Sequence, residues 1–463
     1  MKNPKQYAIM MIIALTCASA LLYYSVPSDE GADPIGPLDC SDCNIVFISI
    51  DTLRADHLGV YGYYRDTSPN IDELAGHSIV FKNAYSTAST TTESHMSMFT
   101  SLFPRIHGIR NTNDAIGFRS ILLEGVRTVT QLLKEKGYKT VGFTDGGNVY
   151  SKLGFSRGFD YYSNDGNITK AIEYVKDHKD GEKFFLFYHT YHVHSPYILE
   201  PGYDKFFNKE YEGDIPSTHD ELGKAGRNLS FERWQDRYQS ITNSTDPKDI
   251  QHLKDLYDGE ISQMDEWMGD LFQAIRENAP NTVIIFTSDH GEEFRDHGHL
   301  FHRRKAYEEL VHVPLIISHP NIRAGSVVEG RVSLIDLAPT ITDVAGIPPI
   351  GQFQGRSLAE IVSGGRRDAQ VFIDMSRTRS LIDGDLKIIR TGLGDEYYDL
   401  GNDSREKLPL KPDSLTGAGI KLKLFLREAE YKVLRTLYYG GEKETLETDD
   451  LLKNRLRELG YLT

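Results

Sequence analysis

The sequence predicts an α/β protein: an open, mostly parallel sheet with helices on both faces, plus a small antiparallel-sheet subdomain at the C-terminal end. Two observations predict this architecture. From Asn44 onward, short and almost continuously apolar runs alternate with helical segments, which is typical of parallel strands covered on both faces. After about Ile347 the strand-like pieces become shorter and are separated by tight turns, which is typical of a small antiparallel sheet.

The elements of the first part can be placed from their apolar runs and helical patterns. We expect residues 44–347 to form one large domain. The predicted helices are Thr128–Lys136 and Asp249–Asn278. The predicted strands are Asn44–Ile50, Lys139–Phe143, Lys183–Tyr188, Thr282–Thr287 and Val313–Ser318.

Residues 348–463 are predicted to form the C-terminal subdomain. Strand-like pieces lie between residues 370 and 400, and an Asp-Gly turn at Asp383–Gly384 marks a hairpin. Helices are expected to follow this sheet to the end of the chain.

The N-terminal segment predicts export. Lys2 and Lys5 precede an apolar run that extends to about residue 26. Such a run is a signal peptide or, at close to the roughly 20 residues that span a bilayer, a retained membrane anchor. We favour the anchor because Leu21–Tyr24 prolong the run past the best cleavage point. Residues 1–26 thus predict an extracytoplasmic protein, either secreted or attached to the membrane.

Residues 27–43 form a polar linker rich in Pro, Gly and Asp, and it ends in Cys40 and Cys43. Two cysteines cannot make a four-thiolate zinc site, which leaves a local disulfide or a redox pair. We favour the disulfide because no thioredoxin-like pattern surrounds the pair.

Composition narrows the class of partner. The chain has 463 residues, 39% of them hydrophobic and 26% charged, with a formal net charge of −15. A nucleic-acid partner requires a clustered basic face, so this acidic balance argues against one.

Candidate catalytic residues follow the ends of several predicted strands. Asp51 follows the first strand, Asp289 and His290 follow the strand near residue 287, and His194 lies shortly after the strand near residue 188. Ligands of open α/β sheets bind at the carboxyl ends of the strands. These residues are therefore expected to converge, and carboxylate and imidazole groups together suit a divalent metal.

Several long motifs, in the same order along the chain, resemble the sulfatase family of the alkaline phosphatase superfamily. One resembles the first strand and loop of sulfatases and begins NIVFISIDTLRADHLGVYGYYRDTSPN at Asn44. A second resembles their second metal-binding segment and reads TVIIFTSDHGEEFRDHGHLFH from Thr282. Shorter matches are HSPY at His194–Tyr197 and YDGEISQMD at Tyr257–Asp265.

This resemblance implies that Asp51, Asp289 and His290 bind one divalent metal, with the nucleophile as the fourth ligand. Sulfatases carry Cys-x-Pro-Ser-Arg at the nucleophile. Counting back from a Pro-x-x-His-Gly landmark at Pro104–Gly108 places Thr91 at the cysteine and His95 at the arginine. Thr90 and Thr92 are the competing registers.

The threonine changes the expected chemistry. Sulfatases oxidise their cysteine or serine to an aldehyde, whereas oxidation of a secondary alcohol gives a ketone, which hydrates poorly. A threonine nucleophile instead resembles the phosphodiesterase and phosphotransferase branches, in which a metal-bound hydroxyl attacks phosphorus. His95 in place of arginine, and the absence of Lys-x-His from the stretch that begins at Lys139, also remove charge that would hold sulfate.

We therefore expect an enzyme that hydrolyses or transfers phosphate mono- or diesters of a small molecule, glycan or lipid. Thr91 and His95 would be catalytic, His194 and His302 would assist catalysis and contact the ester, and Arg303 would add charge for the substrate. Zinc or manganese suits this ligand set better than calcium. The alternatives are a sulfuric ester hydrolase and a catalytically silent surface protein that uses the scaffold for binding.

Overall fold

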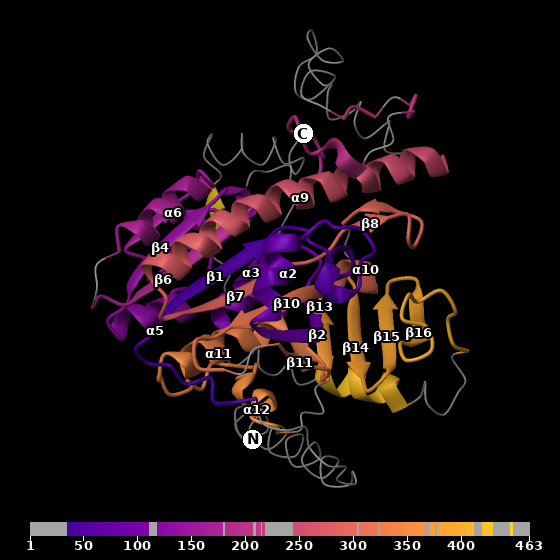
Figure 1. Ribbon diagram of the computed structural model, residues 1–463. Coiled ribbons are helices and arrows are strands. Elements are labelled where there is room, and N and C mark those ends of the chain that lie inside the picture. The colour runs from indigo at the N-terminus through magenta and orange to yellow at the C-terminus, as the bar shows by residue number, and fades with distance from the viewer. Residues whose placement is uncertain are drawn as a thin grey trace, which may run out of the picture.

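A computed structural model of the 463-residue chain shows a large α/β unit with a small sheet beside it (Figure 1). The structure describes residues 35–447 except 111–117, 179–180, 207–209, 214, 218–243, 303–304, 323–324, 366–369, 376, 412–418 and 429–444. The predicted export segment at residues 1–26 lies outside the described residues. Among those described, no helix is long and apolar enough to span a membrane.

A nine-stranded sheet forms the centre of the molecule, in the order β11-β2-β10-β7-β1-β6-β4-β5, with β12 paired to β2. β1 lies between β6 and β7 and runs parallel to both. The strands are β1 (Asn44–Ile50), β2 (Ile79–Tyr85), β4 (Lys139–Thr144), β5 (Tyr161–Ser163), β6 (Phe184–Thr190), β7 (Thr282–Ser288), β10 (His312–Ser318), β11 (Ser326–Val328) and β12 (Val332–Ser333).

One predicted strand runs in the opposite direction. The sequence groups Val313–Ser318 with the parallel strands, but β10 is antiparallel to both of its neighbours, β7 and β2. The sheet as a whole is still mostly parallel, as predicted. The apolar run reflects burial on both faces, which an antiparallel strand in the middle of a covered sheet shares with parallel ones.

Helices cover both faces of this sheet because β1 is apolar on both sides. Ile45 and Phe47 pack in one core, whereas Val46, Ile48 and Ile50 pack in the other. The first core is closed by α3 (Thr91–Thr100), α5 (Val129–Glu135) and α11 (Leu337–Val344), and the second by α2 (Pro69–Gly76), α6 (Ile168–Lys176) and α9 (Pro247–Asn278).

The two predicted helices form within two residues of their predicted bounds. Thr128 caps α5 through a capping box: its hydroxyl accepts from the Gln131 amide, and the Gln131 side chain accepts from the Thr128 amide. α9 begins at Pro247 after Asp246, whose carboxylate accepts a hydrogen bond from the Lys248 amide. Two short helices, α4 (Pro104–His107) and α12 (Ala359–Val362), lie elsewhere in the fold.

The C-terminal sheet is antiparallel, as predicted, and its four strands follow one another in order. They are β13 (Val371–Asp374), β14 (Arg379–Asp383), β15 (Leu386–Thr391) and β16 (Gly394–Asp399). The tight turn at Gly384 joins β14 to β15, and its φ of +56° suits glycine. Side chains from this sheet share an apolar cluster with Tyr85 and Leu310 of the larger unit.

Helical structure after this sheet is described for residues 419–428. The remaining predicted helices fall largely outside the described residues. A separate two-stranded sheet pairs β3 (Phe118–Ser120) with β17 (Thr445–Glu447).

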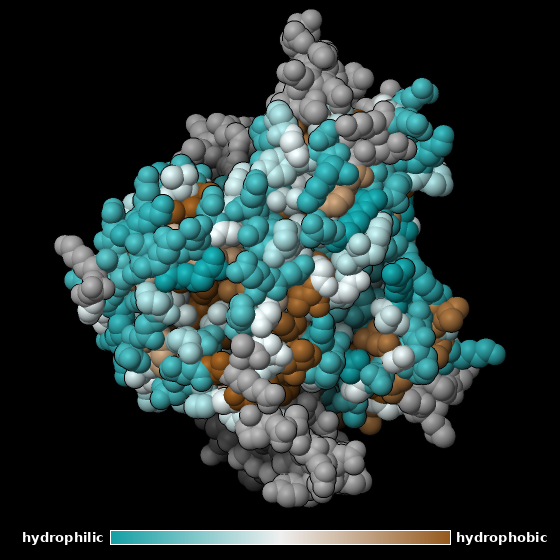
Figure 2. Space-filling view, viewed as in Figure 1, coloured by the Kyte–Doolittle hydropathy of each residue, from teal (hydrophilic) through white to brown (hydrophobic). Residues whose placement is uncertain are grey.

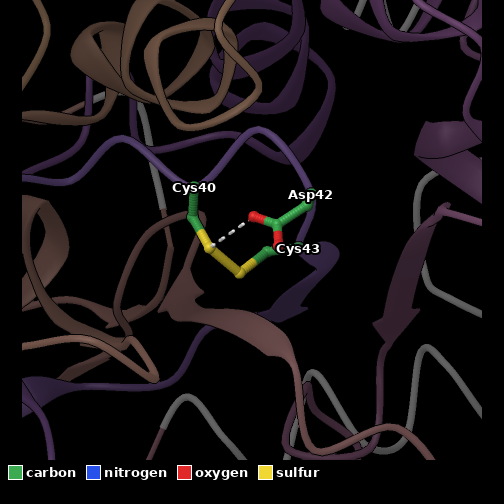
Figure 3. Close-up of side chains that lie close together, drawn as sticks. All are labelled: Cys40, Asp42 and Cys43. Atoms are coloured by element: carbon green, nitrogen blue, oxygen red, sulfur yellow. Dashed lines mark hydrogen bonds between the residues drawn. A yellow bond between two sulfur atoms is a disulfide. The ribbon is translucent and has the colours of Figure 1, made fainter.

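Cys40 and Cys43 form the local disulfide that the sequence favours, directly before β1 (Figure 3). Both cysteines are buried, and the Cys40 amide donates to the carbonyl of Val344 at the end of α11. The face of the molecule in Figure 2 is mostly hydrophilic, in keeping with the acidic composition.

Candidate active site

Three strand ends meet at one edge of the central sheet. Ile50, the last residue of β1, is in register with Ser288 on β7 and with Thr190 on β6. Asp51 and Asp289 therefore leave neighbouring strands at the same level. The convergence expected from the sequence is present in the structure.

Helix α3 delivers a threonine hydroxyl to the same place. Thr91 is its first residue and is fully buried. Its Oγ1 donates to Asp51 Oδ2 at 3.1 Å and lies 3.5 Å from Nε2 of His290.

The two competing threonines point elsewhere. The hydroxyl of Thr90 donates to the Glu93 carboxylate, and that of Thr92 donates to the carbonyl of Asn148. Among the three, only the Thr91 hydroxyl bonds to a candidate metal ligand.

Asp51, Asp289 and His290 have the geometry and burial of a metal site. One potential ligand atom from each lies within 4.8 Å of the others, and all three side chains are fully buried. Within the described part of the chain, Asp51 Oδ1 and Asp289 Oδ2 have no hydrogen-bond partner. A buried carboxylate oxygen without a partner is costly, and a divalent cation would satisfy both.

The protonation preferences of these groups fit the same interpretation. Burial raises the pKa of Asp51 and of Asp289 above their usual values. Burial also opposes protonation of His290, but Asp289 and Asp51 outweigh it and raise the pKa of this histidine. His290 Nδ1 donates to the carbonyl of Gly291 at 2.9 Å, which leaves Nε2 facing the two carboxylates.

His194 and His302 stand next to this cluster. The rings of His302 and His290 are 4.6 Å apart between centroids, and those of His302 and His194 are 4.9 Å apart. His194 Nδ1 donates to the Ser195 carbonyl, and His302 Nδ1 pairs with the Glu292 carboxylate at 3.1 Å.

Burial lowers the pKa of both histidines, to about 4 for His194, so they are neutral at pH 7. With the proton on Nδ1 in each ring, Nε2 is the hydrogen-bond acceptor.

His95 lies against Thr91, Ser49 and Asp289. Its Nδ1 donates to the Thr91 carbonyl at 2.9 Å, and its Nε2 accepts from the Ser49 hydroxyl at 2.9 Å. Burial lowers the pKa of His95 to about 3, and its ring is 3.5 Å from the Asp289 carboxylate. Both nitrogens therefore bond to protein groups, which suits a residue that positions Thr91 and Asp289.

Two buried groups at the site were not among the residues predicted from the sequence. Glu292 accepts from the Tyr197 hydroxyl at 3.0 Å and holds His302, and burial raises its pKa to about 7. His189, at the end of β6, lies 3.6 Å from Asp51 Oδ2. A glutamate in a charged loop gives no sign of burial in the sequence. Arg303, predicted to contact substrate, lies outside the described residues.

Comparisons with known proteins agree with this geometry. The family model described as Sulfatase matches residues 43–347. Arylsulfatase K of Danio rerio is 32% identical over 134 residues, 28% of this chain and 25% of that protein. Arylsulfatase K of Mus musculus is 24% identical over 381 residues, 71% of this chain and 65% of that protein. The chain thus covers less than two thirds of either relative. An N-acetylglucosamine-6-O-sulfatase of Bacteroides thetaiotaomicron is 24% identical over 401 residues, 69% of this chain and 70% of that protein.

Solved structures share the fold. BT4656 in complex with its substrate D-glucosamine-2-N,6-O-disulfate aligns with a TM-score of 0.69 and 21% identity, over 87% of this chain and all of that one. A phosphonate monoester hydrolase of Agrobacterium radiobacter aligns with a TM-score of 0.65 and 19% identity, over 84% of this chain and 96% of that one. Because the family model spans most of the larger α/β unit, the chain belongs to the sulfatase family of ester hydrolases.

Proposed function

We propose that this protein is an exported, metal-dependent enzyme that hydrolyses or transfers phosphoric esters, with Thr91 as its nucleophile. One observation carries the proposal. The Thr91 hydroxyl, alone among three consecutive threonines, is directed at Asp51 and His290. Members of the sulfatase family use a divalent metal. Asp51, Asp289, His290 and Thr91 would hold the ion, which lowers the pKa of a bound hydroxyl and neutralises charge on the transferred group.

The first step transfers the phosphoryl group to the threonine. Thr91 Oγ1 forms a bond to phosphorus as the bond to the leaving oxygen breaks. The hydroxyl proton goes to Asp51 Oδ2, which already accepts its hydrogen bond, and the leaving oxygen takes a proton from solvent. Thr91 is the first residue of α3, so the positive end of the dipole of this ten-residue helix lies at the developing negative charge.

The second step releases the phosphoryl group. A water, or an acceptor alcohol in a transferase, attacks phosphorus and the bond to Thr91 Oγ1 breaks. Because His194 and His302 are neutral and carry their protons on Nδ1, their Nε2 atoms can accept a hydrogen bond from the attacking molecule and orient it, and its proton passes to solvent. The Thr91 oxygen recovers a proton from Asp51.

The threonine also explains why we favour phosphorus over sulfur. Oxidation of a threonine side chain gives a ketone, so the aldehyde hydrate that sulfatases use cannot form at residue 91. The relatives' names support the second candidate, a sulfuric ester hydrolase, and a glycan is then a natural substrate. A silent binding scaffold would have no need for two buried carboxylate oxygens without partners.

A matched panel of aryl esters tests the proposal. Phosphate monoester, phosphodiester, phosphonate and sulfate substrates with one leaving group would be assayed with zinc, manganese or calcium. A phosphorus ester should react fastest, and a slow phosphate ester should leave a phosphoryl group on Thr91, detectable by mass spectrometry. A sulfate ester that reacts faster than every phosphorus ester would overturn the proposed chemistry and support the second candidate.

A further inference from the structure

The segment that carries His290 and His302 is closed into a small hairpin. β8 (Glu293–Phe294) pairs antiparallel with β9 (Leu300–Phe301). The hairpin begins three residues after His290 and ends one residue before His302. Whatever holds its tip, residues 295–299, therefore restrains both histidines.

His297 at this tip is held on three sides by other parts of the fold. Its Nδ1 is 2.7 Å from Oε1 of Glu309 on α10 (Glu308–Val311), and its Nε2 is 2.9 Å from the carbonyl oxygen of Glu406. Its ring stacks on Tyr307, with centroids 3.7 Å apart and planes 5° apart. Glu406 comes after the C-terminal sheet, so this contact joins the hairpin to the subdomain.

These contacts determine the charge of the ring. A backbone carbonyl can only accept, so Nε2 of His297 must carry a proton. The carboxylate of Glu309 also accepts, so Nδ1 must carry one as well. Burial opposes the charge, but the bond to Glu309 outweighs it and raises the pKa of His297. Below this raised pKa, His297 is therefore an imidazolium in the native fold.

The charged groups around His297 favour the protonated form of its ring. Lys387 of β15 lies 2.7 Å from the carboxylates of Glu308 and Glu406. With Glu309 the group holds three carboxyl groups against one lysine, and His297 supplies a second positive charge. Burial raises the pKa of Glu406 to about 7, so the full negative charge of the group is present only above that pH. The other charged groups facing the tip are Glu293, which accepts from the His297 and His299 amides, Lys407, which donates to the Asp296 carbonyl, and Arg54, which pairs with the Asp296 carboxylate at 3.0 Å.

We propose that His297 is a positioning residue, which as an imidazolium fastens the hairpin tip to the C-terminal subdomain and so holds His290 and His302 in place. The contacts of His297 do not depend on whether the protein has the proposed activity. The consequence for catalysis rests on the proposed function of those two histidines. Loss of the His297 charge would leave an unprotonated nitrogen facing an acceptor, and the tip would separate from Glu309 or Glu406.

Hydrogen exchange followed by mass spectrometry tests this in the full-length protein. In the wild type, exchange of the peptides that contain residues 293–302 and 403–408, corrected for intrinsic rates, should rise about tenfold or more as pH increases through the pKa of His297, as expected for loss of one charge-assisted bond. The direction follows because a raised histidine pKa stabilises the docked state below it and not above it.

Two variants complete the test. His297→Gln, which can donate to only one of the two acceptors, should exchange fast at every pH and lose the alkaline change. His299→Gln on the same tip should behave like the wild type. Flat wild-type exchange between pH 6 and pH 10 would overturn the proposal and needs no variant. Exchange that changes as expected in a protein without phosphoesterase activity would instead contradict only the proposed function. In an active protein, kcat should fall in His297→Gln with little change in KM.

Discussion

Replacing Asp289 by asparagine would separate two effects of this carboxylate, which are its destabilisation of the metal-free fold and its contribution to metal binding. In the metal-free protein, Asp289 Oδ2 has no hydrogen-bond partner in the described part of the fold, and the carboxylate is repelled by Asp51. Asparagine has the same shape, and its Oδ1 can keep the bonds from the amides of Thr52 and His290. We expect the variant to lose metal and to gain stability in its metal-free form.

The size of this gain follows from burial. Burial is the largest cause that raises the pKa of Asp289, and repulsion from Asp51 is the next. Removing one buried carboxylate charge, whose Oδ2 has no hydrogen bond, should raise the free energy of unfolding by about 1–3 kcal/mol. At about 2 °C per kcal/mol, Tm should rise by about 2–6 °C. The penalty on the charged form arises only above the unfolded pKa of Asp, so the gain should vanish below about pH 4.

The assay is thermal unfolding after chelation, at pH 7.5 and pH 4, together with metal analysis of the untreated proteins. Asp258→Asn is the matched control. Asp258 is equally buried, but its carboxylate pairs with His57, Tyr63 and Arg65, each at 2.7 Å. That variant should lose stability with or without chelator. A chelated Asp289→Asn protein that melts at or below the wild-type temperature at pH 7.5 would refute the reasoning.

Two further predictions concern the nucleophile and export. Thr91→Ala should abolish turnover while the far-UV circular dichroism stays unchanged, and Thr90→Ala and Thr92→Ala should stay active; the reverse pattern would show that the register is wrong. A reporter that works only outside the cytoplasm should be active when fused behind residues 1–43. A soluble product with an N-terminus near Leu21 would show cleavage in place of the membrane anchor that we favour.

Much of the fold could be predicted because burial leaves a direct trace in the sequence. The runs that became β1, β4, β6 and β7 are mostly apolar and almost entirely buried, and their ends identify where Asp51 and Asp289 lie. Strand direction leaves no such trace, which is why β10 was grouped with the parallel strands. β2 was missed because Lys82 and Asn83 interrupt its apolar pattern. The structure accommodates Lys82 in this strand because its ammonium group donates to the carbonyl of Val60.

The site could be predicted only in part, because the role of a side chain depends on its orientation, which the sequence does not give. Three consecutive threonines look equivalent in the sequence, and the start of α3 is what directs Thr91 and not its neighbours toward Asp51. The burial of Glu292 depends on the hairpin that follows it, and on Tyr197 from a distant loop. The alignment that puts His95 at an arginine position says nothing of its hydrogen bonds to Ser49 and Thr91.

The origin of Thr91 on a helix, while Asp51 and Asp289 come from strands, bears on how such a site changes during evolution. The spacing of the two carboxylates is set by backbone pairing between β1 and β7, which no side chain at residue 91 can disturb. The side chain at residue 91 can therefore be exchanged without a change in the positions of Asp51 and Asp289. Thr91→Ser would present a primary hydroxyl and Thr91→Cys a thiol to the same carboxylates, so one scaffold could be adapted to a different reaction by single substitutions.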